Sequence, residues 1–253
     1  MCTLILLRRP DHDWPLLLAA NRDEMTDRPW RPPARHWRDQ PDVTAGMDLL
    51  AGGSWLGLSD AGMVAAIMNR RDTLGPQAGK HSRGQLVLKS LQYTHAAAAA
   101  ALGADLDPAW YRSFNLVVAD RLAAFWICHR GDDGPGRIET HRLPPGLTML
   151  TDADPNDARS PRIRDYLPRF QCASAPDPEA EHGWSAWTDL LASRRCDAAG
   201  DPGSAMTVVT DRGFGTSSSS LVALPAVRGT ELRPIWLFAP GRPDQTPYQP
   251  ITL

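Results

Sequence analysis

The sequence contains few cysteines, no block of basic residues and no long apolar run. Its four cysteines, Cys2, Cys128, Cys172 and Cys196, lie far apart, with no C-x-x-C pair. This spacing argues against a disulfide framework and against zinc, so we expect reduced thiols and no bound metal. The formal net charge of −2 gives no sign of a nucleic-acid partner or of an anionic membrane surface.

Apolar stretches are short along the whole chain. None approaches the roughly 20 residues that a membrane-spanning helix needs. The N-terminus also lacks a basic segment followed by an apolar core and a small-residue cleavage site, which secretory signals carry. We therefore expect a cytoplasmic protein with no integral membrane segment. The oligomeric state stays unknown.

Length and composition are sufficient for a large packed core. For 253 residues with a hydrophobic fraction of 42%, one domain over 1–253 is the default, although two small domains are possible. Neither a repeat nor a clear domain boundary interrupts the chain. Nine tryptophans are a high number, and we expect some of them to line a groove for a flat apolar ligand.

The first residues, Met1, Cys2 and Thr3, precede the apolar run 4–7. Cys2 is small enough for the initiator methionine to be removed, which would leave a thiol and a free α-amine on one residue. An α-amine has a reference pKa of about 7.7 to 8.0, so near neutral pH it can act as the general base for the thiol. The alternative is an ordinary buried cysteine, which Cys2 considered alone favours.

Polar residues follow two of the predicted strands. The apolar strand at 15–20 ends on the tetrad Asn21, Arg22, Asp23 and Glu24. Two runs at 51–58 and 62–68 predict a hairpin, whose second strand ends on Asn69 and Arg70. Strands that end in this way place functional groups at a sheet edge.

The remaining segments are groups of strands and groups of helices, which indicates a layered fold. Further strands are expected at 114–120, 123–128, 138–143, 147–150, 206–210, 218–224 and 235–238, with an irregular loop at 26–43 and a tight loop at 131–136. Helices are expected after Ser82, over 94–102, from Pro161 and around 184–191. Residues 82–85 have the form of a capping box, and Gly52, Gly53 and Gly57 indicate turns and close strand packing.

Several of these motifs occur in a characteristic order. They are Met1-Cys2-Thr3, Asn21-Arg22-Asp23-Glu24, the glycine-rich run 52–58, Met68-Asn69-Arg70, Ser82-Arg83-Gly84, Phe114-Asn115-Leu116 with Asp120, and Phe214-Gly215-Thr216 with the serines after it. From the first residue to about Leu224, the chain resembles the NRDE family. Its eukaryotic members are called transport and Golgi organisation proteins of the second type.

The resemblance implies an α+β fold of the N-terminal-nucleophile hydrolase type, a four-layer αββα sandwich with two antiparallel sheets between helical layers. The chain is also similar to the cysteine branch of these hydrolases, whose bile-salt and penicillin acylases cleave linear amides. By analogy, Cys2 attacks a carbonyl group, Asp23 orients the α-amine and Arg22 stabilises the thiolate. Asn69 and Asn115 then donate hydrogen bonds to the oxyanion.

Other side chains are expected to contact a small-molecule or acyl substrate, namely Asn21, Arg70 and Trp55. Hydrolysis of this kind implies no cofactor. The family has also been linked to haem trafficking and to lipid or acyl-thioester handling, so the alternative is a non-enzymatic carrier with haem or an acyl lipid as its ligand. A haem carrier needs an axial ligand, and none of the seven histidines lies in a diagnostic motif.

Two positions depart from the amidase pattern. Amidases of this class separate the arginine and the aspartate by two residues, whereas Arg22 and Asp23 are adjacent. Adjacent residues of an extended strand point to opposite faces, so we expect only one of them to face Cys2 unless the chain bends. Many relatives also carry an arginine where this chain has Ser217, and Arg212 is near enough in sequence to substitute for it.

Overall fold

The apolar run near the N-terminus forms a central strand of an antiparallel sheet. The computed structural model describes residues 2–131, 136–197, 199–227 and 232–253, in two compact units. The first unit comprises Met1–Arg28 and Pro145–Thr252. Its sheet has the order β10-β1-β2-β11-β12-β13, with β1 (Thr3–Arg8), β2 (Leu16–Met25), β10 (Gly146–Leu150), β11 (Phe214–Leu224), β12 (Ile235–Ala239) and β13 (Gln249–Pro250).

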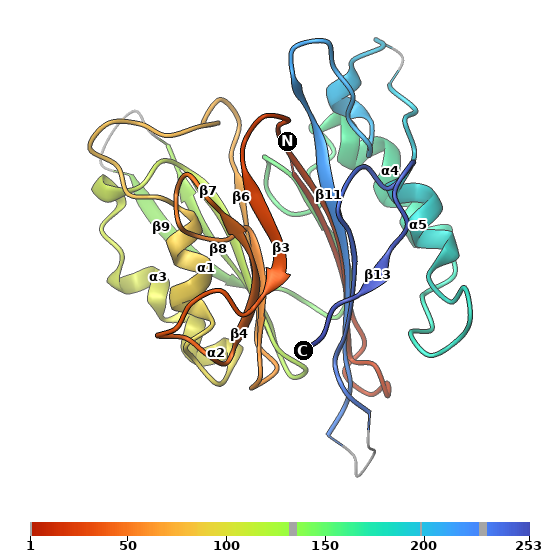
Figure 1. Cartoon of the computed structure of the whole chain (residues 1–253), viewed down its shortest axis with the longest axis horizontal. Coiled ribbons are helices and arrows are strands. Elements are labelled where there is room, and N and C mark those ends of the chain that lie inside the picture. Colours follow the sequence, from red (N-terminus) through yellow and green to blue (C-terminus); the bar gives the residue numbers. More distant parts are fainter. Residues whose placement is uncertain (1, 132–135, 198, 228–231) are drawn as a thin grey trace. The chain divides into compact units, whose positions relative to one another are not determined.

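Helices α4 (Pro161–Cys172) and α5 (Ser185–Leu191) cover one face of this sheet (Figure 1). Pro161 occupies the first turn of α4, where a missing backbone N–H costs nothing, which confirms the predicted helix start. Ile163, Tyr166 and Phe170 follow the helical period and are fully buried in the core of this unit. A 3₁₀ turn at Pro202–Ser204 lies beside α4.

The second unit comprises Pro29–Pro144, together with Leu253. All neighbouring strands of its sheet are antiparallel, in sequence order from β3 to β9. The strands are β3 (Trp30–Ala34), β4 (Val43–Asp48), β5 (Leu56–Ser59), β6 (Val64–Asn69), β7 (Phe114–Ala119), β8 (Ala124–Arg130) and β9 (Arg137–Arg142).

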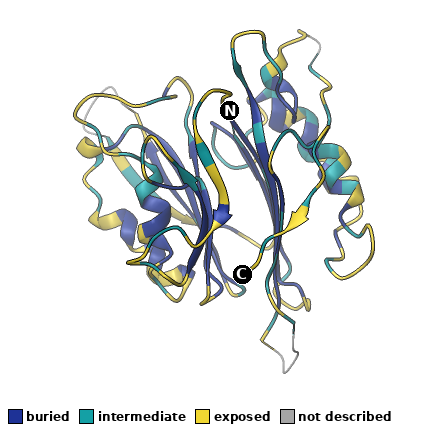
Figure 2. Cartoon of the chain, in the orientation of Figure 1, coloured by how far each residue is buried: buried dark blue, intermediate teal, exposed yellow. Residues whose placement is uncertain are grey.

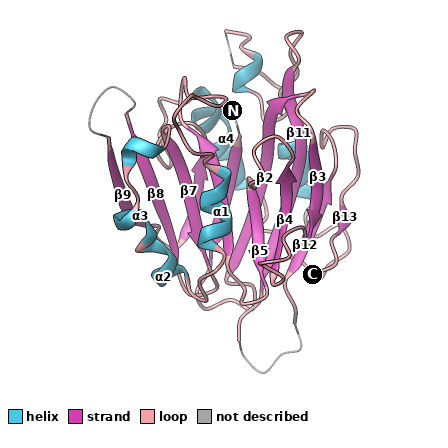
Figure 3. Ribbon diagram, turned by 60° about the vertical axis from the view of Figure 1, so that its left-hand side comes forward, coloured by secondary structure: helices cyan, strands magenta, loops and turns pink. Residues whose placement is uncertain are grey.

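One face of this second sheet carries short helices (Figure 3). They are α1 (Gly84–Ser90), α2 (Ala96–Ala100) and α3 (Leu102–Asp105), followed by a 3₁₀ turn at Pro108–Trp110. Leu86, Val87 and Leu91 pack on alternate strand residues such as Ile67 and Leu116. Figure 2 shows the result within each unit, with the inner strands buried and the strands β3 and β13 largely exposed.

Two motifs that lie 30 residues apart in sequence form one contact. The backbone N–H of Ser54 donates to the carbonyl oxygen of Gly84 at 3.1 Å. A Cβ atom on Gly53 would lie 2.5 Å from the backbone of Gly84, so the approach requires glycine. The structure thus confirms close packing as the role of Gly53.

The predicted capping box is wrong. Helix α1 has Arg83 at its N-cap and no side-chain cap bond, and its first residue, Gly84, accepts the backbone hydrogen bond from Ser54. The guanidinium of Arg83 donates to the Oγ1 atom of Thr73 at 3.0 Å and to the carbonyl oxygen of Ser113 at 2.8 Å. Arg83 therefore ties the loop after β6 to the start of β7.

Two strand boundaries also differ from expectation. Residues 26–43 were expected to form an irregular loop, but they contain the edge strand β3, which tolerates Pro32 and Pro33 because an edge leaves backbone positions without ladder bonds. Residues 206–210 form only an isolated bridge between Val209 and Gly215. There the carbonyl oxygen of Met206 accepts a hydrogen bond from the side chain of Asn21.

Some expectations concern parts that the structure does not address. The tight loop at 131–136 falls mostly outside the described residues, and so does Met1. The chain divides into two compact units, and the assignment of residues 1–253 to a single domain stays a prediction. In the described part of the chain, no helix is long and apolar enough to cross a bilayer.

Candidate functional site

Cys2 lies immediately before β1, at the end of the strand that pairs with β2 in the register Thr3 to Asn21. The Cys2 side chain is half-buried, and its Sγ atom lies 3.5 Å from the backbone carbonyl oxygen of Asp23. Thr3 and Ile5 take the face of β1 that the helices cover. Alternation along the strand therefore directs Cys2 toward the opposite face.

The environment of Cys2 keeps its thiol protonated. Burial is the main cause that raises the pKa of the Cys2 thiol, and the negative charge of Asp23 raises this pKa further. The charge of the N-terminus, the backbone contact with Asp23 and the positive charge of Arg22 lower the pKa, in that order of size, but do not compensate for burial and the Asp23 charge. The thiol therefore needs a base to become a nucleophile near neutral pH.

Arg22 and Asp23 point to opposite faces of β2, as their adjacency predicts. The Asp23 carboxylate contacts Arg162 of α4, on the helix-covered face. The Arg22 guanidinium contacts Ser217, and alternation puts it on the same face as Cys2. Arg22 is thus the member of the pair that shares a face with the thiol.

The Asp23 carboxylate is the centre of a buried polar cluster. Its two oxygens accept hydrogen bonds from the Nη1 atom of Arg162 at 2.9 Å and from the Oγ1 atom of Thr216 at 2.6 Å. The same Nη1 atom donates to the Oγ1 atom of Thr3 at 2.6 Å, and Nη2 donates to the carbonyl oxygen of Gly203 at 2.7 Å. The cluster connects α4 to three strands of the sheet.

Sequence reasoning missed Arg162, although only 1% of its side chain is exposed. No local pattern distinguishes it from Arg164, which lies two residues later and is half exposed. From the sequence, an arginine beside Pro161 in the first turn of a helix is interpreted as a solvated surface residue. Only the packing of α4 on the sheet identifies it as the partner of Asp23.

The Arg22 guanidinium is held on its own face by neighbouring side chains. Its Nη1 atom donates to the Oγ atom of Ser217 at 3.0 Å, and its Nη2 atom lies 3.9 Å from the Glu24 carboxylate. Ser217 is the extra residue in a register shift between Thr216 and Ser218 on β11. The residue that replaces the family arginine therefore contacts Arg22 directly.

Arg212 does not lie in this cluster of contacts. It is an exposed residue of the turn before β11, where its backbone N–H donates to the Oγ1 atom of Thr210 at 3.4 Å. The position of Arg212 therefore does not support the hypothesis that Arg212 takes the place of the family arginine. The hydroxyl of Ser217 and the carboxylate of Glu24 are polar groups that the chain supplies next to Arg22.

Asn21 faces the helices and is only 1% exposed. Its Nδ2 atom donates to the carbonyl oxygens of Leu191 and Met206 at 3.0 and 2.9 Å. Its Oδ1 atom accepts a bond of 2.6 Å from the hydroxyl of Ser219, which also contacts the hydroxyl of Tyr248 at 2.7 Å. These hydrogen bonds hold the Asn21 side chain within the protein. The expected contact of Asn21 with substrate stays a prediction.

A second group of predicted residues lies in the second unit. Asn115, on β7, is fully buried and pairs with Met68 of β6. Its Oδ1 atom accepts hydrogen bonds from the Nη1 atom of Arg70 at 2.7 Å and from the indole N–H of Trp126 at 3.1 Å. Because both partners can only donate, the orientation of the Asn115 amide is determined.

Asn69 and Trp55 are placed differently from Asn115. Ile67 packs in the helix-covered core, so alternation along β6 directs Asn69 toward that face, where it is half-buried. The Trp55 ring lies against Gly46 of β4 and makes an edge contact with Trp30, with ring centroids 5.8 Å apart. The structure thus brings Cys2 next to Asp23 and onto the face of Arg22 in the first unit, and Asn115 next to Arg70 in the second. Asn21, Asn69 and Trp55 lie outside these contacts.

Comparison with other proteins identifies the family. Residues 1–224 match the sequence profile of Transport and Golgi organisation 2. The Transport and Golgi organization protein 2 homologs of Bos taurus and Homo sapiens are each 34% identical over 145 and 146 residues. In both cases the match covers 54% of this chain and 50% of the relative, so the chain spans about half the length of the curated relatives it matches.

Solved structures with a similar fold are distant in sequence. A Caenorhabditis elegans ortholog of N-acylethanolamine-hydrolyzing acid amidase is 10% identical, with a TM-score of 0.52 over 87% of this chain and 92% of that chain. A mutant conjugated bile acid hydrolase from Clostridium perfringens is 11% identical, with a TM-score of 0.52 over 100% of this chain and 97% of that one. These likenesses confirm the predicted α+β fold class of the N-terminal-nucleophile hydrolases. The profile match over residues 1–224 shows that the chain belongs to the Transport and Golgi organisation 2 family.

Proposed function

We propose that the chain is a cysteine amidohydrolase in which Cys2, exposed by removal of Met1, attacks a small amide or related acyl bond. The observation that carries the proposal is the position of the Cys2 thiol, at the end of a central strand and on the face of Arg22. Because the pKa of this thiol is raised, the mechanism requires a base that removes its proton. While Met1 is attached, the nitrogen of Cys2 is a peptide amide, so methionine removal would create the missing base.

Similar folds give indirect support for this reaction class. One solved neighbour is named as an amidase and another as a conjugated bile acid hydrolase. The bile acid hydrolase mutant carries alanine in place of a cysteine that is also numbered 2. A small N-acyl amide is therefore the substrate class to examine first.

The reaction proceeds in two stages. The α-amine takes the proton from Sγ, the thiolate forms a bond to the carbonyl carbon, and the amide C–N bond breaks as the proton passes to the leaving amine. Water then hydrolyses the thioester and restores the thiol. No cofactor is needed, and the four free cysteines fit the reducing cytoplasm in which we expect the protein to act.

Two residues beside Cys2 take different roles in this mechanism. Arg22 favours the thiolate, since its charge lowers the pKa of the Cys2 thiol. Asp23 is a positioning residue, because its carbonyl oxygen accepts the S–H bond while its carboxylate holds Arg162. Arg162 in turn donates to Thr3, the residue next to the nucleophile.

The labelling rate of Cys2 tests the proposal most directly. Intact-mass measurement should first show that Met1 is absent. Iodoacetamide should then alkylate Cys2 faster as pH rises, because the rate follows the thiolate fraction. Arg22→Gln is expected to slow labelling at neutral pH by about two- to tenfold, since loss of a positive charge raises the thiol pKa.

Matched measurements separate this charge effect from damage to the fold. Arg22→Lys keeps the positive charge and should restore most of the labelling rate. Exposed Cys172 should react equally fast in all variants. Retention of Met1, or identical Cys2 rates for Arg22→Gln and the unmodified chain, would count against the proposed mechanism.

We extend the proposal to Asn115 as a donor to the oxyanion. Asn115→Asp retains an oxygen acceptor for Arg70 and Trp126 but removes the amide donor. Loss of one such donor typically lowers kcat by about 10²- to 10³-fold, and this is the expected effect. Steady-state kinetics measure it, and an unchanged kcat in a folded Asn115→Asp variant would exclude Asn115 as an oxyanion donor. Asn69 carries no such prediction, because strand alternation directs it toward the core.

A carrier of haem or an acyl lipid is the second candidate. It is favoured by the family description, which names transport and not hydrolysis. A carrier predicts a saturable absorbance change on titration with haemin, of equal amplitude in the unmodified chain and in Cys2→Ala. A hydrolase without carrier function predicts no saturable change, so the titration distinguishes the two candidates.

A further inference from the structure

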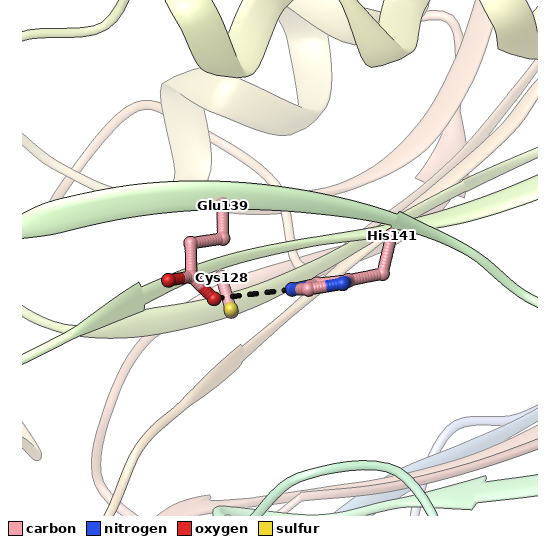
Figure 4. Close-up of side chains that lie close together, drawn as sticks. All are labelled: Cys128, Glu139 and His141. Carbon is pink, nitrogen blue, oxygen red and sulfur yellow. Dashed lines mark hydrogen bonds and ion pairs between the residues drawn. The ribbon is translucent and has the colours of Figure 1, made fainter.

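Three side chains with different metal-binding atoms meet on the second sheet. Cys128 of β8 and both Glu139 and His141 of β9 bring their donor atoms within 4.8 Å of one another. Figure 4 shows the Glu139 carboxylate and the His141 ring reaching from β9 toward the sulfur of Cys128. The Nε2 atom of His141 lies 3.2 Å from a carboxylate oxygen of Glu139.

The strand register determines this arrangement. Cys128 and Glu139 are direct partners across the β8–β9 ladder, and His141 lies two residues further along β9. Residues at this spacing share one face of a strand, so all three donors project in the same direction. Ile138 of β9 packs in the helix-covered core, which places the donors on the opposite face.

Neighbouring side chains hold the imidazole in place. The His141 ring stacks on Trp126, with ring centroids 5.1 Å apart and an interplanar angle of 29°. Trp126 is itself anchored by its hydrogen bond to Asn115. Support of this kind orients the ligands of functional metal sites.

We propose that Cys128, Glu139 and His141 bind a zinc ion. Thiolate, imidazole and carboxylate are the ligand types that Zn²⁺ uses in proteins, at distances of about 2.0 to 2.3 Å. Tetrahedral ligation would require the donor atoms to lie about 3.3 to 3.8 Å apart, so the observed cluster, within 4.8 Å, would contract by side-chain rotation on binding. Three protein ligands leave a fourth position for water or another ligand.

Charge and access are compatible with a bound cation. Loss of the thiol proton to solvent gives a thiolate that, with the carboxylate, balances the two charges of the metal. Arg130 and Arg137 lie 3.6 Å from the Glu139 carboxylate and compete for it, but 42% and 83% of their side chains are exposed. Exposed ion pairs contribute at most about 1 kcal/mol, so the arginines can be displaced. The half-exposed His141 provides the route of entry for the metal.

Titration of the full chain with Co²⁺ tests the proposal, since cobalt replaces zinc and reports its ligands by absorption. We expect a sulfur-to-cobalt charge-transfer band that saturates at one equivalent and disappears when Zn²⁺ is added. Cys128→Ser should abolish this band. His141→Gln should weaken cobalt binding at least about tenfold, because one ligand is lost.

Control variants make the result specific to this cluster. Cys172→Ser and Cys2→Ala should retain the band, since neither sulfur belongs to the site. A band that persists in Cys128→Ser, disappears in Cys2→Ala or is absent from the unmodified chain would overturn the proposal. Because Cys128 is fully buried and its replacement can disturb folding, the half-exposed His141 provides an independent test: unchanged cobalt affinity in His141→Gln would also overturn it.

Discussion

Cys2→Ala is expected to lower the turnover of small N-acyl amides by at least about a thousandfold, which corresponds to about 4 kcal/mol of transition-state stabilisation. The variant removes the only atom that forms the covalent bond to the acyl group, while alanine keeps the strand end intact. The measurement is kcat/KM on a panel of N-acylethanolamines and conjugated bile acids of different acyl length. Circular dichroism checks that the variant is folded.

Two further variants distinguish a nucleophile from a structural cysteine. Cys196→Ala removes another half-buried thiol of the same unit and should retain full activity. A form with an N-terminal extension that is not cleaved keeps the Cys2 thiol but blocks its α-amine, and should be inactive. Activity in Cys2→Ala would exclude Cys2 as the nucleophile, and activity in the extended form would exclude the amine as the base.

Asp23→Asn is expected to lower the free energy of unfolding by about 3 to 5 kcal/mol, the range for breaking a buried ion pair. The Asp23 carboxylate and Arg162 are at most 1% exposed and lie 2.9 Å apart. Asparagine has nearly the same shape, but it leaves the positive charge of Arg162 buried without its counter-charge. Urea unfolding at constant pH measures the change, with the slope used to check two-state behaviour.

An exposed pair of the same chemistry provides the control. Arg35 and Asp60 form a bidentate contact with distances of 3.0 and 2.7 Å, yet both side chains are at least 40% exposed. Arg35→Met should therefore cost at most about 1 kcal/mol. The Asp23→Asn, Arg162→Met double variant should lose less stability than the sum of the single variants, because the buried charge is then absent. A loss below that of Arg35→Met would contradict the assigned role of the pair.

Much of the secondary structure follows from local patterns. The short apolar runs and the turn residues between them predict β5, β6, β7 and β8, and the Ser-Pro start predicts α4. The opposite orientation of Arg22 and Asp23 also follows from adjacency alone, since a strand has a side-chain period of two. Local patterns fail at edge strand β3, whose prolines are typical of a loop, and at residues 206–210, where the carbonyl oxygen of Met206 accepts a hydrogen bond from Asn21.

By itself, the sequence determined the family motifs, the fold class that they imply, and the choice of Cys2 with Arg22 and Asp23 as candidates. Only the tertiary structure decided which groups those candidates contact, because the partners lie far away along the chain. Arg162 reaches Asp23 across 139 residues, and Ser217 reaches Arg22 across 195. Cys128, Glu139 and His141 likewise form no sequence motif, since hydrogen bonding between two strands, and not spacing along one, brings their donor atoms together.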